Sequence, residues 1–155
     1  MTIINGRACV VNGTPVDKVF SNGRQVYGRN LIVAKTIKNN CTLRSNGTIF
    51  RYLISFTTDY IPVVANQKYT ISIYGTTNLC VSRVAYYDSS KNFISREYDR
   101  YISIGSSEVI VIPSGASYIK SSSDTPDKSG KYENNFKIEK GFIATPWTPA
   151  PEDVM

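Results

Sequence analysis

Histidine is absent from the 155 residues of this sequence, and its absence excludes several kinds of site. A Ser-His-Asp or Cys-His triad needs an imidazole as its general base, and a His-ligated metal needs one as a ligand. Long apolar runs are also missing, so no segment is expected to span a membrane as a helix. We therefore expect neither these catalytic centres nor a membrane-embedded protein.

Cysteine is scarce and is not spaced for metal binding. The three residues are Cys9, Cys41 and Cys80, an odd number with no CxxC pair. Neither a zinc knuckle nor a complete disulfide framework is supported. Residues 1–11 also lack a basic stretch followed by a long apolar one, so no signal peptide is expected. The sequence predicts buried thiols in a protein assembled in a reducing cytoplasm.

Acidic residues are fewer than basic ones, 12 against 18, which gives a net charge of +6. A basic protein is attracted to anionic polymers, whether nucleic acid, acidic lipid or a wall polymer. The cations are scattered, and no basic run is interleaved with aromatic residues, so nucleic acid is not expected as a partner. Solubility alone would also explain the charge, and an anionic surface polymer stays open as a partner.

Convincing pairs of catalytic carboxylates are missing too. A glycosidase needs two carboxylates that flank the scissile bond. Glu97 and Asp99 would share a strand face, and Asp124 and Asp127 would meet only if their loop curls. We interpret both pairs as solvated surface residues and expect a protein that is not an enzyme. No cofactor is expected, although a structural calcium held by Asp and carbonyl oxygens is an open alternative.

Short alternating segments are what the sequence does contain. In residues 69–74, Tyr69, Ile71 and Ile73 fall on one face of an extended strand and polar residues fall on the other. Such segments, separated by turns every eight to twelve residues, predict an all-β sandwich or barrel, and no helical periodicity is sustained. We expect strands near residues 31–37, 41–45, 48–56, 67–75, 79–87, 93–98, 107–112, 117–123 and 133–140.

Asn-Gly pairs mark the expected turns, at Asn5, Asn12, Asn22 and Asn46. This pair supplies the positive φ angles that a type I′ hairpin turn needs. Residues 1–28 should form small hairpins, beginning with a strand at residues 2–4, that bury too little surface to stand alone. We expect three parts: a hairpin or attachment segment at 1–28, a β-sandwich at 29–147 and an extended, proline-rich tail at 148–155.

Strand parity divides the expected core from the expected surface. Sugar recognition uses flat aromatic rings together with planar donors and acceptors, and such residues occupy the outward positions. Whether these outward residues share one sheet stays open. The expected core comprises Ile71, Ile73, Val84, Tyr86, Ile119, Phe136 and Ile138. The candidate carbohydrate-binding residues are Arg83, Tyr87, Tyr74, Lys120, Asn135 and Lys137, with Arg100 and Tyr101 in a loop.

Several segments resemble parts of known proteins. Residues 18–32, KVFSNGRQVYGRNLI, resemble the joint between modules in tail and baseplate proteins of phages that infect Gram-positive bacteria. Residues 137–141 followed by 144–153 are similar to the end of a sandwich module in the same proteins. Between them, residues 59–63, 68–70, 86–94 and 112–119 look like its inner strands and turns. The likeness covers nearly all of residues 18–153, although Lys120-Ser121-Ser122-Ser123 is more polar than that module usually is.

This resemblance implies a jelly-roll-like β-sandwich related to carbohydrate-binding modules, made in the host cytoplasm and carried on the virion tail. It implies non-catalytic binding of a host cell-wall polysaccharide or teichoic-type polymer, contacts with other tail or baseplate proteins, and a homotrimer. It does not assign ligand residues. A purely structural tail or baseplate connector is the main alternative. An oligonucleotide-binding barrel is a third, and it would need aromatic residues along a basic groove.

Overall fold

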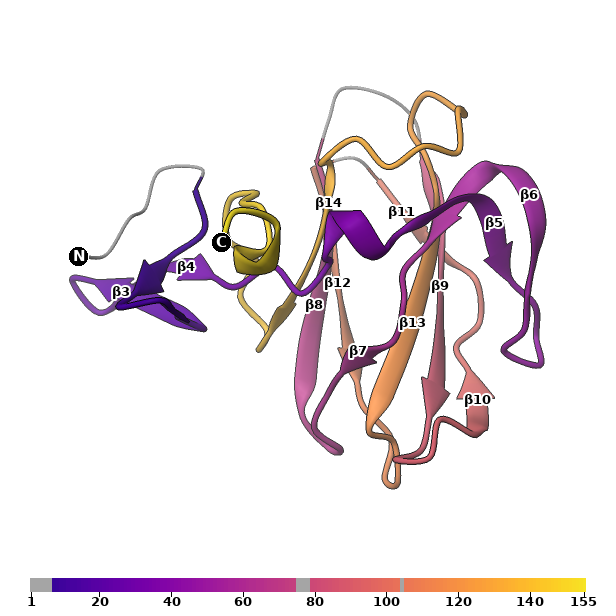
Figure 1. The fold of residues 1–155 in the computed structure, drawn as a ribbon, viewed down its shortest axis with the longest axis horizontal. Helices are drawn as coiled ribbons and strands as arrows, with labels where there is room; N and C mark the ends of the chain where they lie inside the picture. The colour runs from indigo at the N-terminus through magenta and orange to yellow at the C-terminus, as the bar shows by residue number, and fades with distance from the viewer. Residues whose placement is uncertain (1–6, 75–78, 104) are drawn as a thin grey trace.

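The computed structural model describes residues 7–74, 79–103 and 105–155 as two antiparallel β-sheets packed face to face, with two small hairpins beside them (Figure 1). The predicted all-β sandwich is therefore confirmed. The only helical elements among these residues are two three-residue 3-10 turns, η1 (Ala34–Thr36) and η2 (Pro151–Asp153). No helix in this part of the chain is long and apolar enough to cross a membrane.

The large sheet has the strand order β10-β9-β13-β6-β5, and β11 and β7 pair with β9 and β13. All of its strand pairs are antiparallel. Its strands are β5 (Lys38–Leu43), β6 (Ile49–Thr57), β7 (Ile61–Pro62), β9 (Cys80–Tyr87), β10 (Phe93–Arg96), β11 (Arg100–Ile102) and β13 (Tyr118–Asp124).

The small sheet has the order β12-β8-β14, again antiparallel. Its strands are β8 (Lys68–Ile73), β12 (Ser107–Val111) and β14 (Phe136–Lys140). The hairpins are formed by β1 (Val10–Val11) with β2 (Thr14–Pro15), and by β3 (Lys18–Ser21) with β4 (Arg24–Gly28). Figure 1 shows β3 and β4 on the side of the small sheet, with the C-terminal turn next to them.

One apolar core lies between the two sheets. All seven predicted core residues belong to it, so that prediction is confirmed. Phe56 of the large sheet and Phe136 of the small sheet meet across it, with ring centroids 4.8 Å apart in an edge-to-face arrangement. Such ring pairs add about 0.5–1.5 kcal/mol beyond the area that they bury. All three cysteine side chains are buried and remain thiols, as expected.

The prediction of a strand at residues 31–37 is wrong. The backbone of this stretch makes isolated hydrogen bonds to other parts of the protein and does not pair along its length with a neighbouring strand. The N–H of Leu31 donates to the carbonyl of Ile138 at 2.8 Å, which is a single ladder bond. The chain then turns into η1, where the N–H of Ala34 donates to Asp153 at 2.8 Å. β5 therefore begins only at Lys38. The short strands β7 and β11 were not predicted, and residues 2–4 and Asn5 lie outside the described residues.

Two of the Asn-Gly pairs form the predicted turn. Asn12-Gly13 and Asn22-Gly23 have positive φ at both residues, as type I′ requires. At Asn46-Gly47 only the glycine has positive φ, 79°, and its N–H donates to the carbonyl of Arg44 at 3.0 Å. A side chain at Gly47 would also place its Cβ 2.3 Å from the ring of Phe93, so both geometry and space require glycine.

The C-terminal segment covers the outer face of the small sheet. The Thr145 hydroxyl accepts a hydrogen bond from the N–H of Gly28 at 3.1 Å, which joins β4 to this segment. The indole N–H of Trp147 donates to the carbonyl of Phe136 at 3.1 Å, and Asn30 donates to the carbonyl of Thr148 at 2.9 Å. The segment is thus packed into the protein as well as extended by its prolines, and η2 follows it.

Candidate functional site

The outer face of the large sheet collects side chains from β9 and β13. Along β9, Val84 and Tyr86 point into the core, so Arg83 and Tyr87 point outward, as parity predicted. Cross-strand partners share a face, and Tyr87 lies opposite Tyr118 in β13. Lys120, two residues further along β13, shares that face.

The β5–β6 hairpin bends over part of this face and changes the exposure of Tyr87. Leu43 packs against Ala85 and Tyr87, and the Tyr87 hydroxyl donates to the carbonyl of Gly47 at 2.6 Å. Only 4% of Tyr87 is exposed, so the expectation that it reaches solvent is wrong. Burial, with a smaller effect from Tyr60, raises the pKa of Tyr87 to about 12. Tyr87 therefore lies beneath the β5–β6 hairpin, where a ligand in solution would not touch it.

Arg83 also points outward, but its guanidinium is already engaged. It lies 3.4 Å from Asp99 and 3.4 Å from Asp124, and it donates to the Thr42 hydroxyl at 3.2 Å. Its side chain is 12% exposed. The expectation that Arg83 extends freely into water is therefore wrong, because these partners from β5, β13 and the β10–β11 loop surround it. Arg83 fastens the β5–β6 hairpin to the sheet.

Beyond the hairpin lies an aromatic and cationic area formed by Tyr60, Tyr118, Lys91 and Lys120, which we call the tyrosine–lysine surface. The Tyr60 and Tyr118 ring centroids are 5.9 Å apart with planes tilted by 74°. The Lys120 ammonium lies 4.2 Å from the Tyr60 ring centroid. The Lys91 ammonium lies 4.9 Å from the same ring and 5.4 Å from Tyr118. Two cations therefore stand over two partly exposed tyrosines.

A tight turn holds Lys91 in this position. Asp88 accepts hydrogen bonds from the backbone N–H groups of Ser90 and Asn92, both at 2.9 Å. Lys91 itself has a φ of 65°, in the left-handed region. The bonds from Asn92 and then from Ser90 lower the pKa of Asp88, because they stabilise the carboxylate. The turn thus fixes the backbone from which the exposed Lys91 side chain extends over the two tyrosines.

The electrostatics of the surface favour an anionic group. Burial is the main cause that lowers the pKa of Lys120, and the nearby ammonium groups of Lys38 and Lys91 add to it. Asp59 acts in the opposite direction. A phosphate or carboxylate on a ligand would relieve the repulsion between these lysines. Tyr60 also borders a hollow of about 360 Å³ that Asp59, Arg29 and Glu152 help to line, which offers acceptors and donors for hydroxyls.

Three predicted site residues lie in the opposite, small sheet or next to the ends of its strands, so the structure does not bring the predicted set together. The Tyr74 hydroxyl donates to the carbonyl of Thr145, and Asn135 precedes β14. Lys137 is 0% exposed, which makes the expectation of a solvent-facing lysine wrong. Its ammonium donates to the Thr145 hydroxyl at 2.9 Å and to the Pro146 carbonyl at 2.8 Å beneath the C-terminal segment.

Arg100 and Tyr101 occupy β11, at the edge of the large sheet. Arg100 pairs with Glu97 at 3.0 Å and with Glu108 at 3.5 Å, and Tyr101 is 64% exposed. Glu97 also accepts a hydrogen bond from the Tyr86 hydroxyl at 2.7 Å. Asp99 lies 3.0 Å from Arg96 as well as near Arg83. Both carboxylates therefore have cationic partners.

Within the described residues, no group of three or more His, Cys, Asp or Glu could hold a metal ion.

Sequence reasoning found Lys120 but missed its neighbours. The position of Tyr118 could have been predicted, because it lies two residues before Lys120 on the same strand and so shares its face. Tyr60 and Lys91 lie in loops, where parity says nothing about direction. Their position depends on the β13–β7 pairing and on the turn after β9, both of which are set by tertiary structure.

Comparison with known proteins gives little further guidance. No protein-family model matches the chain, and no curated protein matches it. Among solved structures, one similar chain is the N-terminal part of the endo-1,4-β-D-xylanase 10B of Clostridium thermocellum, comprising its CBM22-1 and GH10 modules in complex with xylohexaose. The identity is 15% and the TM-score is 0.30, and the match covers 72% of this chain but only 26% of that one.

Proposed function

We propose that the protein is a non-catalytic binding component of a phage tail or baseplate, and that its tyrosine–lysine surface holds an anionic saccharide of the host cell wall. The observation that carries the binding proposal is the placement of Lys91 and Lys120 over the rings of Tyr60 and Tyr118. A ring face packs against the apolar side of a sugar, and the ammonium groups attract a phosphate or carboxylate.

The phage assignment has a different basis. It rests on the resemblance of residues 18–32 and 137–153 to the ends of tail and baseplate modules. The non-catalytic part of the proposal rests on the carboxylates, because a glycosidase uses two of them to flank the scissile bond. Glu97 and Asp99 are both engaged in ion pairs, whereas a general acid needs a carboxyl group that is free to hold and release a proton.

Titration with purified wall polymer from a Gram-positive host tests this proposal. We expect binding that weakens as salt increases, because the surface is cationic. Tyr118→Ala and Lys91→Gln should each weaken it by about 1–3 kcal/mol, the usual cost of losing one partner of a polar contact. Lys131→Gln changes an equally exposed lysine elsewhere and is the matched control for Lys91→Gln, and Tyr101→Ala changes a more exposed tyrosine outside this surface.

Three outcomes would contradict the proposal or part of it. If no wall polymer binds, the protein is better explained as a structural connector between tail or baseplate proteins. If the polymer binds but Tyr118→Ala and Lys91→Gln leave its affinity unchanged, saccharide recognition occurs elsewhere, and weaker binding by Tyr101→Ala would then assign it to the exposed β11. Release of reducing ends from the polymer would contradict the non-catalytic part.

A further inference from the structure

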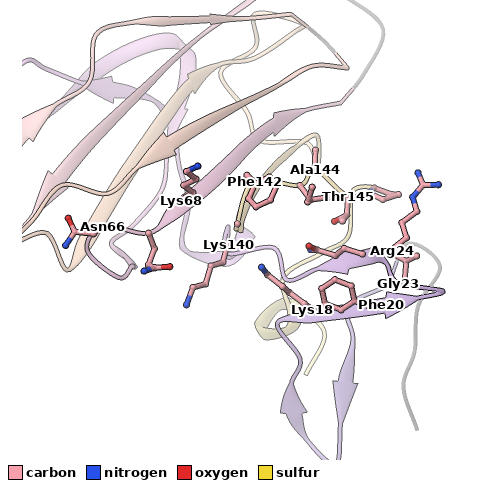
Figure 2. Close-up of a pocket in the computed structure, with 16 residues that line it drawn as sticks. Lys18, Phe20, Gly23, Arg24, Asn66, Lys68, Lys140, Phe142, Ala144 and Thr145 are labelled. Carbon is pink, nitrogen blue, oxygen red and sulfur yellow. The ribbon is translucent and has the colours of Figure 1, made fainter.

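A second surface lies on the other side of the protein, between the β3–β4 hairpin and the small sheet. It is a groove of about 1040 Å³. Figure 2 shows Lys18 and Phe20 of the hairpin facing the segment that carries Phe142, Ala144 and Thr145, with Lys68 and Lys140 further along. We call it the hairpin groove. None of the tyrosine–lysine residues lines it.

The charge of the hairpin groove has one sign. Its lining contains four cations, Lys18, Arg24, Lys68 and Lys140, and no acidic side chain among the described residues that form it. None of these four cations takes part in an ion pair within the described parts of the chain. Clustered cations repel one another unless an anion lies between them. The groove is therefore complementary to a negatively charged ligand.

The groove is also apolar. Phe20 is 60% exposed and Phe142 is 66% exposed, and both rings line it. Val26, Ile143 and Pro146 add further apolar surface. Exposed large apolar side chains gathered in one place mark a surface that another molecule covers. The Lys68 ammonium lies 5.7 Å from the Phe142 ring, so charge and apolar surface alternate within a short distance.

We propose that the hairpin groove binds an extended acidic and apolar segment of a partner protein. A polyphosphate or sugar phosphate would satisfy the cations but would leave Phe20, Phe142 and Ile143 uncovered. A neutral glycan would leave the four cations without a counter-charge. A peptide that carries both acidic and apolar side chains fits both features, because the hairpin wall and the opposite wall each offer cations and an exposed aromatic ring. This site is separate from the saccharide site proposed above.

Defined peptides test this inference on the full-length protein. The probe is a labelled peptide of about ten residues that alternates Glu and Val, long enough in extended form to cross a surface groove. The comparison peptide alternates Gln and Val. We expect the Glu peptide to bind at least about tenfold more tightly than the Gln peptide, because charge-assisted hydrogen bonds are the stronger kind. Arg24→Gln and Lys140→Gln should each weaken binding of the Glu peptide several-fold, and Lys131→Gln should not.

Inorganic polyphosphate, as a second probe, shows whether the groove is specific for a peptide or binds any polyanion. Phe142→Ala should weaken binding of the Glu–Val peptide and leave binding of inorganic polyphosphate unchanged. The inference is overturned if the Glu–Val peptide does not bind, if polyphosphate competes at equal affinity, or if the groove variants bind like Lys131→Gln. Tyr118→Ala should leave peptide binding intact, so failure of the saccharide proposal and failure of this one give different results.

Discussion

At the scale of single residues, Tyr87 illustrates how an outward position can still be buried. Its neighbours Val84 and Tyr86 face the core, and strand parity places Tyr87 on the other side. The β5–β6 hairpin then covers it with Leu43 and Gly47. Parity predicts which side of a sheet a residue occupies. It does not predict whether a distant hairpin will fold over that side.

This burial leads to a prediction about stability. Tyr87→Ala should destabilise the protein by about 3–5 kcal/mol, as for other buried aromatic residues replaced by alanine. From the sequence alone, the same change would be expected to leave the melting temperature nearly unchanged. Urea unfolding followed by circular dichroism measures the difference. Tyr101→Ala, at an exposed tyrosine, should stay within about 0.5 kcal/mol of the wild type, and equal effects of the two changes would contradict the covering role of the hairpin.

The three consecutive serines of β13 show a second limit of sequence reading. Ser121, Ser122 and Ser123 look like a solvated run, yet all three are buried. Ser122 bonds to Thr42 at 2.9 Å, and Thr58 accepts a hydrogen bond from the N–H of Ser121 at 3.0 Å. Their small hydroxyl side chains leave room for Arg83 and Asp124 beside them. Such buried polar contacts depend on partners far away in the sequence, so local pattern cannot reveal them.

At the scale of secondary-structure elements, most strands were predictable and the loops were not. Residues 69–73 alternate strictly and became β8, and residues 80–87 became β9, because each buries one face in the sandwich. β7 contains only two residues, too few for a period to be seen. The C-terminal segment was predicted as extended from its prolines, but its packing on Lys137 and Glu139 depends on the folded sheet.

Thr145 is the residue that joins this segment to two other elements. Its hydroxyl accepts from the N–H of Gly28 and from Lys137, and it donates to Glu139 at 2.6 Å. Thr145→Val keeps the shape and removes these bonds, so we expect a loss of about 3 kcal/mol from buried groups left without partners. Thr145→Ser keeps the hydroxyl and should cost only about 1 kcal/mol for the missing methyl group. Thermal and urea unfolding of both variants would reveal equal losses if the hydroxyl did not matter.

At the scale of the whole molecule, buried titratable groups give stability a defined dependence on pH. Burial lowers the pKa of Lys137 to about 8, and the carboxylate of Glu139 opposes this effect. Burial lowers the pKa of Lys120 as well. Above the lowered pKa, the unfolded chain binds more protons at these lysines than the folded protein does. Stability should therefore rise with pH from about 8 towards the ordinary lysine pKa of about 10.4.

Tyrosines reverse this trend at higher pH. Burial raises the pKa of Tyr87 and Tyr132 to about 12, so above about pH 10 the unfolded tyrosines lose protons that the folded ones keep. Stability should then fall, which places its maximum near pH 9–10. Urea unfolding from pH 7 to 11 would measure this profile. Lys137→Met should flatten the rise and keep the fall, and a steady decline of the wild type from pH 7 would contradict the burial of Lys137, whose neighbours include Glu139 and Tyr27.

The hairpin groove and the tyrosine–lysine surface lie on opposite sheets, so a partner held in one leaves the other open. Copies fixed side by side through their grooves would present their tyrosine–lysine surfaces together to a repeating polymer. Once one copy has bound, the next meets the same chain at a high effective concentration, and avidity can exceed the affinity of one copy by about 10²–10⁴-fold. A shallow surface with two tyrosines and two lysines would then hold the polymer firmly, although each single contact exchanges quickly.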